Sequence, residues 1–141
     1  ISKGDAIIGF MNRLGGISAV AKITDKNVAA LGSTLMTFGS DESSAANAVS
    51  STFSRLSRAT TMKPVKRGLK ALGLDASKIQ KGMVKDAQGT LMTIIERINT
   101  IPEHLRSAVL TDIVGGNYGD EIIKLVKNTD EWKRQIAFKR E

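Results

Sequence analysis

Residues 112–121 read DIVGGNYGDE, and this stretch separates two classes of fold. Its centre, GGNYG, holds three glycines between two apolar segments. Such a turn suits either a phosphate-binding loop or a corner between helices. GGNYG matches neither GxGxxG nor the GK[ST] ending of a phosphate loop, and no strand pattern precedes it. The stretch therefore predicts a helical corner, where Gly115 or Gly116 ends one helix and Asn117 caps the next.

The apolar residues on both sides of this corner repeat with helical spacing. Leu105, Val109 and Ile113 precede it, and one apolar stripe resumes at Ile122 and continues to Ile136. The rest of the chain repeats the same period, without an alternating strand pattern bounded by hairpin turns. We expect an all-α protein, a compact irregular or orthogonal bundle of about seven to eight short helices. The expected ranges are 5–21, 25–38, 41–58, 64–73, 76–85, 87–99, 102–114 and 119–138.

Polar residues suited to helix N-termini stand at most of the expected breaks. In TIPE, residues 100–103, Thr100 and Glu103 match a capping box, with Pro102 in the first turn. Elsewhere a short hydroxyl or carboxylate side chain precedes the periodic run. These further N-cap candidates are Thr24, Ser40, Asp75, Asp86 and Thr129.

Glycine is frequent inside the expected helices, where each one costs about 1 kcal/mol against alanine. Two explanations stay open: the glycines permit close contact between helices, or they mark hinges. Gly15–Gly16 is the candidate kink of the first helix. The interior glycines are Gly9, Gly15, Gly16, Gly32, Gly68 and Gly82.

The composition of the 141 residues fits one helical domain, which we expect to span residues 1–141. There is no cysteine, which excludes disulfides and thiolate chemistry. No apolar run approaches the roughly 20 residues of a membrane-spanning helix. The N-terminal ISKGDAIIGF lacks Met and does not resemble a signal peptide, so we expect a fragment of a longer protein.

Residues that could carry catalysis are few. The single histidine, His104, falls in the first turn of an expected helix, and a zinc site built on it would need several carboxylates. No GxSxG nucleophile motif is present. The pairs Asp41–Glu42, Asp120–Glu121 and Asp130–Glu131 each open an expected helix, where the helix dipole favours negative charge. We expect no catalytic, cofactor or metal site, no small-molecule substrate and no enzyme activity.

Positive charge is concentrated in one stretch of a chain whose net charge is +7. Asp75 is the only acid between Arg55 and Lys85. No aromatic residue lies in that stretch, so base stacking is not expected there. The favoured interpretation is a solvated basic face that aids solubility or docks an acidic neighbour, and the alternative is a contact with DNA or an anionic membrane. The candidate polyanion contacts are Arg55, Arg58, Lys63, Lys66, Arg67 and Lys70.

Three segments in this order resemble the conserved helical region of bacteriophage and prophage tail tape measure proteins. They are VAALGSTLMTFGSDESSAANAVSSTFSRLSRAT at 28–60, VKRGLKALGLDASKI at 65–79, and GTLMTIIERINTIPEHLRSAVLTDIVGGNYGDEIIKLV at 89–126. The resemblance runs from about Asp5 to Phe138. One departure is Val114, which stands where the family has phenylalanine before the glycine.

The resemblance implies a structural component of the phage tail, made in the bacterial host cytoplasm. It implies a role in tail assembly and tail length determination, and in DNA ejection. The implied partners are tube subunits, tail assembly chaperones and tail-end proteins, together with self-association. The chain would be one domain of a much longer tape measure protein, too short to be the ruler itself. The alternative function is a basic helical module that binds DNA or the anionic envelope.

Overall fold

The computed structural model describes residues 3–14 and 23–140. Within these ranges it contains nine α-helices and one 3₁₀ turn, and no strand. The all-α prediction is confirmed. The elements are α1 (Lys3–Leu14), α3 (Asp25–Thr37), α4 (Glu42–Leu56), η1 (Ala59–Thr61), α5 (Lys63–Ala71), α6 (Ala76–Lys85), α7 (Ala87–Ile98), α8 (Glu103–Val114), α9 (Gly119–Lys127) and α10 (Thr129–Arg140).

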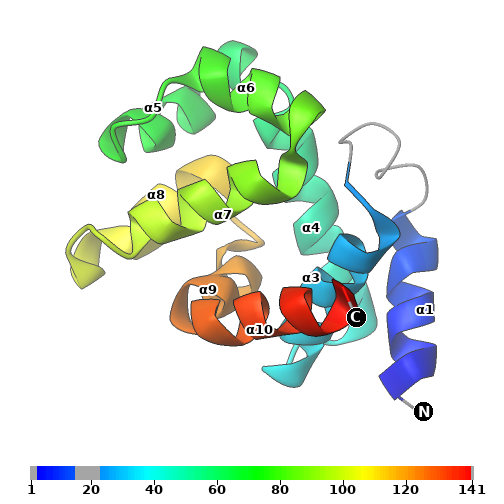
Figure 1. The fold of residues 1–141 in the computed structure, drawn as a ribbon. Coiled ribbons are helices and arrows are strands. Elements are labelled where there is room, and N and C mark those ends of the chain that lie inside the picture. Colours follow the sequence, from blue (N-terminus) through cyan, green and yellow to red (C-terminus); the bar gives the residue numbers. More distant parts are fainter. Residues whose placement is uncertain (1–2, 15–22, 141) are drawn as a thin grey trace.

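The helices cross one another at steep angles in an irregular bundle (Figure 1). The last helix, α10, packs on α3, so the C-terminal part of the chain returns to the N-terminal part. The first helix, α1, packs on both α3 and α4. At the other end, α5 packs on α8 and α6 packs on α7. Residues 59–85, at the top of Figure 1, form this end of the bundle, which we call the lobe. None of the described helices has the length and apolar character needed to cross a membrane.

The core contains mainly aliphatic side chains around a few aromatic rings. Trp132, Phe10 and Phe53 are its largest buried side chains. At Gly32 an added Cβ would lie 2.5 Å from the Phe10 ring, so α1 can approach α3 this closely only because that position has no side chain. Of the two explanations for glycines inside helices, close contact between helices therefore applies at Gly32. The four described interior glycines, Gly9, Gly32, Gly68 and Gly82, all lie within helices, while Gly15 and Gly16 lie outside the described residues.

Three of the predicted helix caps are confirmed. The Thr24 side chain accepts a hydrogen bond from the backbone N–H of Asn27 at the start of α3. Asp75 does the same for α6, and Asp86 for α7. Each bond satisfies an N–H that has no partner inside its own helix.

Three other predicted caps are wrong. Asp41, not Ser40, caps α4, because its carboxylate accepts from the Ser44 N–H at 2.7 Å. The Thr100 hydroxyl donates to the carbonyl of the preceding helix, so no capping box forms, and α8 begins after Pro102 without a side-chain cap. Thr129 likewise donates backward, to α9. In the last two cases a hydroxyl bonds to the helix before it.

The GGNYG stretch is a corner between α8 and α9, as predicted. Gly115 ends α8 with φ of +98° and ψ of 154°, a conformation that is essentially restricted to glycine. Val114, just before it, is buried at 1% exposure. The predicted Asn117 cap is wrong: Tyr118 precedes α9, and no side chain caps that helix.

The expected single helix over 119–138 is two helices, α9 and α10. Asn128 leaves the helical conformation, with φ of −129° and ψ of 39°. Its side-chain amide donates to the Lys124 carbonyl at 2.9 Å, and such a local bond competes with the backbone ladder. After this break the chain continues as α10, on which Trp132 is fully buried. Leu105, expected on the apolar stripe of α8, is instead 45% exposed.

Candidate functional site

The six candidate polyanion contacts lie on two helices and the turn between them. Arg55 is in the last turn of α4, and Arg58 lies just after Ser57, the residue that caps the end of that helix. The other four, Lys63, Lys66, Arg67 and Lys70, lie on α5 with exposed side chains. The arginines and the lysines of this set have different surroundings.

Arg55 is hydrogen-bonded to the C-terminal end of α8. Its Nε donates to the Ile113 carbonyl at 3.0 Å, and its Nη2 donates to the Asp112 carbonyl at 2.9 Å. Nearby, the Ser51 hydroxyl donates to the Val114 carbonyl at 2.8 Å. The last carbonyls of a helix lack partners within it and carry partial negative charge. Arg55 therefore joins α4 to the glycine corner and is not a free cation.

Arg67 is paired with an acid on α8. Its Nε and Nη2 lie 3.0 and 2.8 Å from the two carboxylate oxygens of Asp112. This two-bond arrangement lowers the pKa of Asp112 and raises the pKa of Arg67, chiefly through the hydrogen bonds. Because Asp112 balances its charge, Arg67 adds little to an anion-binding surface.

Arg58 is exposed, and its guanidinium bonds back to Ser54 in α4. Nε donates to the Ser54 carbonyl at 3.4 Å, and Nη2 to the Ser54 hydroxyl at 3.2 Å. Neither partner is an acid, so the positive charge of Arg58 stays uncompensated at this position. Among the three candidate arginines, Arg58 is the one that bonds neither to an acid nor to α8.

The lysines are free of ion pairs in the described part of the chain. Lys63, Lys66 and Lys70 follow one another at intervals of three and four on α5. They point away from Val65 and Leu69, the buried residues that pack toward the core. A second row on α6 has the same spacing: Lys78, Lys81 and Lys85.

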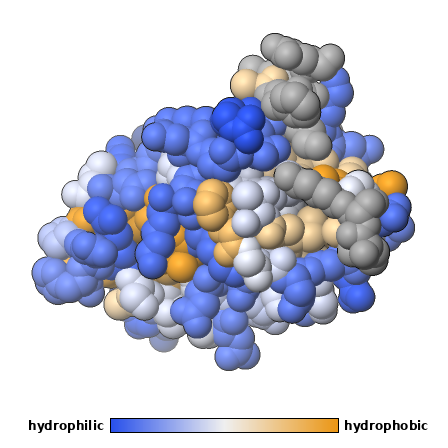
Figure 2. Space-filling model, turned by 90° about the horizontal axis from the view of Figure 1, so that it is seen from below, coloured by the Kyte–Doolittle hydropathy of each residue, from blue (hydrophilic) through white to orange (hydrophobic). Residues whose placement is uncertain are grey.

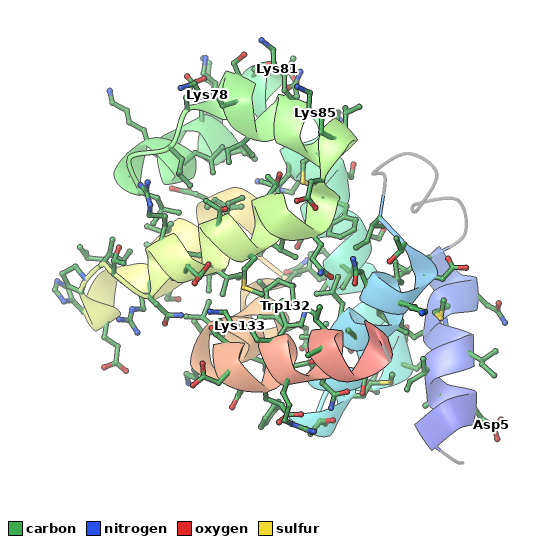
Figure 3. The ribbon with its side chains drawn as sticks, viewed as in Figure 1. Asp5, Lys78, Lys81, Lys85, Trp132 and Lys133 are labelled. Atoms are coloured by element: carbon green, nitrogen blue, oxygen red, sulfur yellow. The ribbon has the colours of Figure 1, made fainter. Side chains whose placement is uncertain are left out.

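The α6 row was not among the six candidates, although the sequence carried the signal for it. The three lysines share the helical spacing that placed the α5 lysines together, and they lie in the same basic stretch. Figure 3 shows their side chains on the outer side of the lobe, away from α7. On the opposite face of α6, Ile79 and Met83 are buried.

A polar cluster on the other side of the glycine corner joins α9 to the start of α4. The Lys124 ammonium donates to a Glu121 oxygen at 2.8 Å and to the Ser40 hydroxyl at 2.7 Å. That hydroxyl in turn donates to Glu121. The bonds from Lys124 and then Ser40 lower the pKa of Glu121. Ser40, expected as a helix cap, thus acts across the fold.

A groove of about 300 Å³ runs between α8 and α9. Leu110, Ile123 and Val126 give it apolar surface, and charged residues of both signs line it as well. One of these, Arg106, donates to the backbone carbonyls of Ile101 and Asn99 and so has a structural partner. The face of the molecule in Figure 2 is mainly hydrophilic, with apolar surface exposed between polar side chains.

The residues considered for catalysis have structural positions. His104 is exposed in the first turn of α8 and does not line the groove. The three acid pairs lie at the N-termini of α4, α9 and α10, as predicted. Across residues 3–14 and 23–140, no group of three or more histidine or acidic side chains is arranged to hold a metal ion.

Comparison with known proteins identifies the family. The model for "Phage-related minor tail protein" matches residues 2–115, from the N-terminal helix to the glycine that ends α8. Neither a curated protein nor a solved structure matches the chain. The tape measure resemblance drawn from the sequence segments is confirmed by the family match. Because the match covers well over half of the 141 residues, the chain belongs to the phage-related minor tail protein family, whose domain is typical of tape measure proteins.

Proposed function

We propose that this chain is a structural and interaction domain of a tail tape measure protein. In this role it acts in tail assembly, as one part of the protein that determines tail length, and in DNA ejection. It is made in the bacterial host cytoplasm and is incorporated into the virion tail. Its partners are tube subunits, tail assembly chaperones, tail-end proteins and other copies of itself. The observation that carries this proposal is the family match over residues 2–115.

The distribution of polar contacts supports a structural role over catalysis. The Arg55, Arg67 and Ser40 side chains each bond across the fold to a distant helix. These contacts hold helices together. A catalytic constellation would instead direct a nucleophile and its base into a shared cavity.

The compact packing supports a docking domain within a longer protein. A continuous helix of 141 residues would be about 210 Å long at 1.5 Å per residue. A compact domain of the same length has a radius of gyration of about 14 Å. Because α10 packs back on α3, this domain contributes little to a length measured along a tail. We therefore assign the ruler function to other parts of the parent protein.

Changing the copy number of this domain in the parent gene tests the proposal. In-frame deletion of the domain is expected to prevent assembly of complete tails, because docking is lost. In-frame duplication is expected to leave tail length unchanged. Electron microscopy of purified particles measures both outcomes, with an equal deletion elsewhere in the parent protein as the control. Infectious particles whose tails shorten after deletion and lengthen after duplication would show that the domain is part of the ruler.

A further inference from the structure

Nearly all of the net charge of the chain lies in one lobe. Residues 59–85, which form η1, α5 and α6, contain seven basic residues and one acid, a net charge of +6 out of +7. The remaining residues are therefore close to neutral. In Figure 1 this segment projects from one end of the bundle above α7 and α8. The molecule has a strongly positive end.

The fold does not use the lysine charges of this end. Arg67 is balanced by Asp112. In the described part of the chain, no ion pair or side-chain hydrogen bond involves the ammonium groups of the two lysine rows. Unpaired cations this close together repel one another, so the rows lower stability slightly and favour binding of an anion. The rows are Lys63, Lys66 and Lys70 on α5, and Lys78, Lys81 and Lys85 on α6.

The chemistry of the lobe selects among anionic partners. A helix that binds a membrane surface needs an apolar face to insert, but the apolar residues Ile79 and Met83 of α6 are buried. Val84, at 56% exposure, is the one large apolar residue of α6 that reaches solvent. Residues 59–85 contain no aromatic side chain on which the bases of a single strand could stack. The lobe therefore presents lysine ammonium groups, and these point charges suit contact with the backbone phosphates of a nucleic acid.

We propose that the α6 row, Lys78, Lys81 and Lys85, binds the phosphate backbone of duplex DNA without sequence preference, and that the α5 row strengthens the local positive potential. Lys78 and Lys85 are separated by about 10 Å along the helix. Duplex DNA carries one negative charge per about 1.7 Å of its axis, so each of the three ammonium groups can meet a separate phosphate. This inference rests on the charge geometry and not on the tail role.

Fluorescence anisotropy with short labelled duplexes of two unrelated sequences tests the proposal at about 50 and about 200 mM salt. The first variant is K78Q/K81Q/K85Q. The control, K26Q/K127Q/K133Q, removes three charges from exposed positions outside the lobe, of which Lys133 is paired with Glu96 at 3.1 Å. The α6 variant is expected to bind at least about tenfold more weakly, and its slope of log affinity against log salt to be less negative by about 3. The control is expected to stay within about twofold of the unmodified chain, because distant charges are screened.

Two further arms separate the alternatives. The variant K63Q/K66Q/K70Q is expected to weaken DNA binding less than the α6 variant does. Co-sedimentation with anionic phosphatidylserine vesicles is expected to be weaker than duplex binding at equal salt. The proposal is overturned by equal DNA affinity of the α6 and control variants, by a larger effect of the α5 variant, or by preferential binding to vesicles. Thermal unfolding of each variant confirms that the fold is intact.

Discussion

Arg55 and Arg67 both bond to the end of α8, one through backbone carbonyls and the other through Asp112. Further along the chain, the side chains of Lys78, Lys81 and Lys85 project from α6 into solvent. The two regions belong to one basic stretch of sequence, yet the first holds the fold together and the second leaves its charge unused. The difference follows side-chain chemistry, because the planar arginine fork can join several acceptors at once, while lysine is a mobile point charge.

Replacing Gly68, at the contact between α5 and α8, should give the largest loss of stability. A Cβ at Gly68 would lie 2.8 Å from Cγ1 of Ile113 and 3.2 Å from the Val109 carbonyl oxygen. Gly68→Val should therefore separate α5 from α8 and lower the free energy of unfolding by about 3 kcal/mol. Ala71→Val, at an exposed position on the same helix, should cost less than about 1 kcal/mol. Urea denaturation measures both, and equal midpoints would show that α5 does not depend on this contact.

Replacing Gly115, in the corner between α8 and α9, should give the next largest loss of stability. Gly115 has a φ of +98°, which alanine adopts only with strain, so Gly115→Ala should lower the free energy of unfolding by about 2 kcal/mol. Gly116 is the matched control, because its φ is not positive and an added Cβ would meet nothing within 4 Å. Gly116→Ala should change stability by less than about 0.5 kcal/mol. Similar thermal shifts for the two variants would contradict the assigned corner geometry.

Removing the Arg55 side chain tests whether it holds α4 to α8. Arg55→Met keeps much of the aliphatic bulk but loses the two bonds to the carbonyls of Asp112 and Ile113, at a cost of about 1.5 kcal/mol. Arg58→Met removes a guanidinium that bonds only to the neighbouring Ser54, four residues earlier, and should change stability by less than about 0.5 kcal/mol. Equal denaturant midpoints would remove the distinction between the two arginines.

Acid should weaken the corner through Glu121. The bonds from Lys124 and Ser40 hold the pKa of Glu121 below its ordinary value of 4.5. The unfolded chain therefore takes up this proton first as the pH falls, and stability decreases from about pH 4.5 downward through the folded pKa. Glu121→Gln should cost about 1 kcal/mol at neutral pH and have a shallower acid dependence. If the free energies of unfolding of the unmodified chain and of Glu121→Gln decrease in parallel below pH 5, the contacts of Glu121 are not the cause of the acid dependence.

The Arg67–Asp112 pair should give the smallest effect. Its Arg67 side chain is 67% exposed, so water and salt screen the attraction. A double-mutant cycle with Arg67→Gln and Asp112→Asn should give a small coupling free energy that decreases further with added salt. A large coupling that salt does not change would contradict the assignment of this pair as a weak, solvent-screened contact between α5 and α8.

The fold was predictable from the sequence because its signals are local. Helical periods and glycine stops act within a few residues, as do caps such as Asp75 and Asp86. Local patterns mispredict the structure where a side chain bonds to a distant or preceding element. Ser40 looked like a cap but bonds to Glu121, and the Asn128 side chain ends α9 within an apparently continuous stripe.

The candidate site was predictable only as a basic stretch. Its charge and helical spacing are visible in the sequence, and both lysine rows follow from them. Which cations remain unpaired depends on α8, whose Asp112 lies 45 residues from Arg67 in sequence. Single-sequence patterns do not encode such long-range pairs, so they do not distinguish Arg55 and Arg67 from the lysines.

The most direct test of this division of roles measures two quantities on two variants. For Arg55→Met and for K78Q/K81Q/K85Q, the free energy of unfolding and the affinity for duplex DNA are determined under the same conditions. The account predicts that the arginine variant loses stability and retains DNA binding, while the lysine variant retains stability and loses DNA binding. Loss of both properties in either variant, or of neither in the lysine variant, would contradict it.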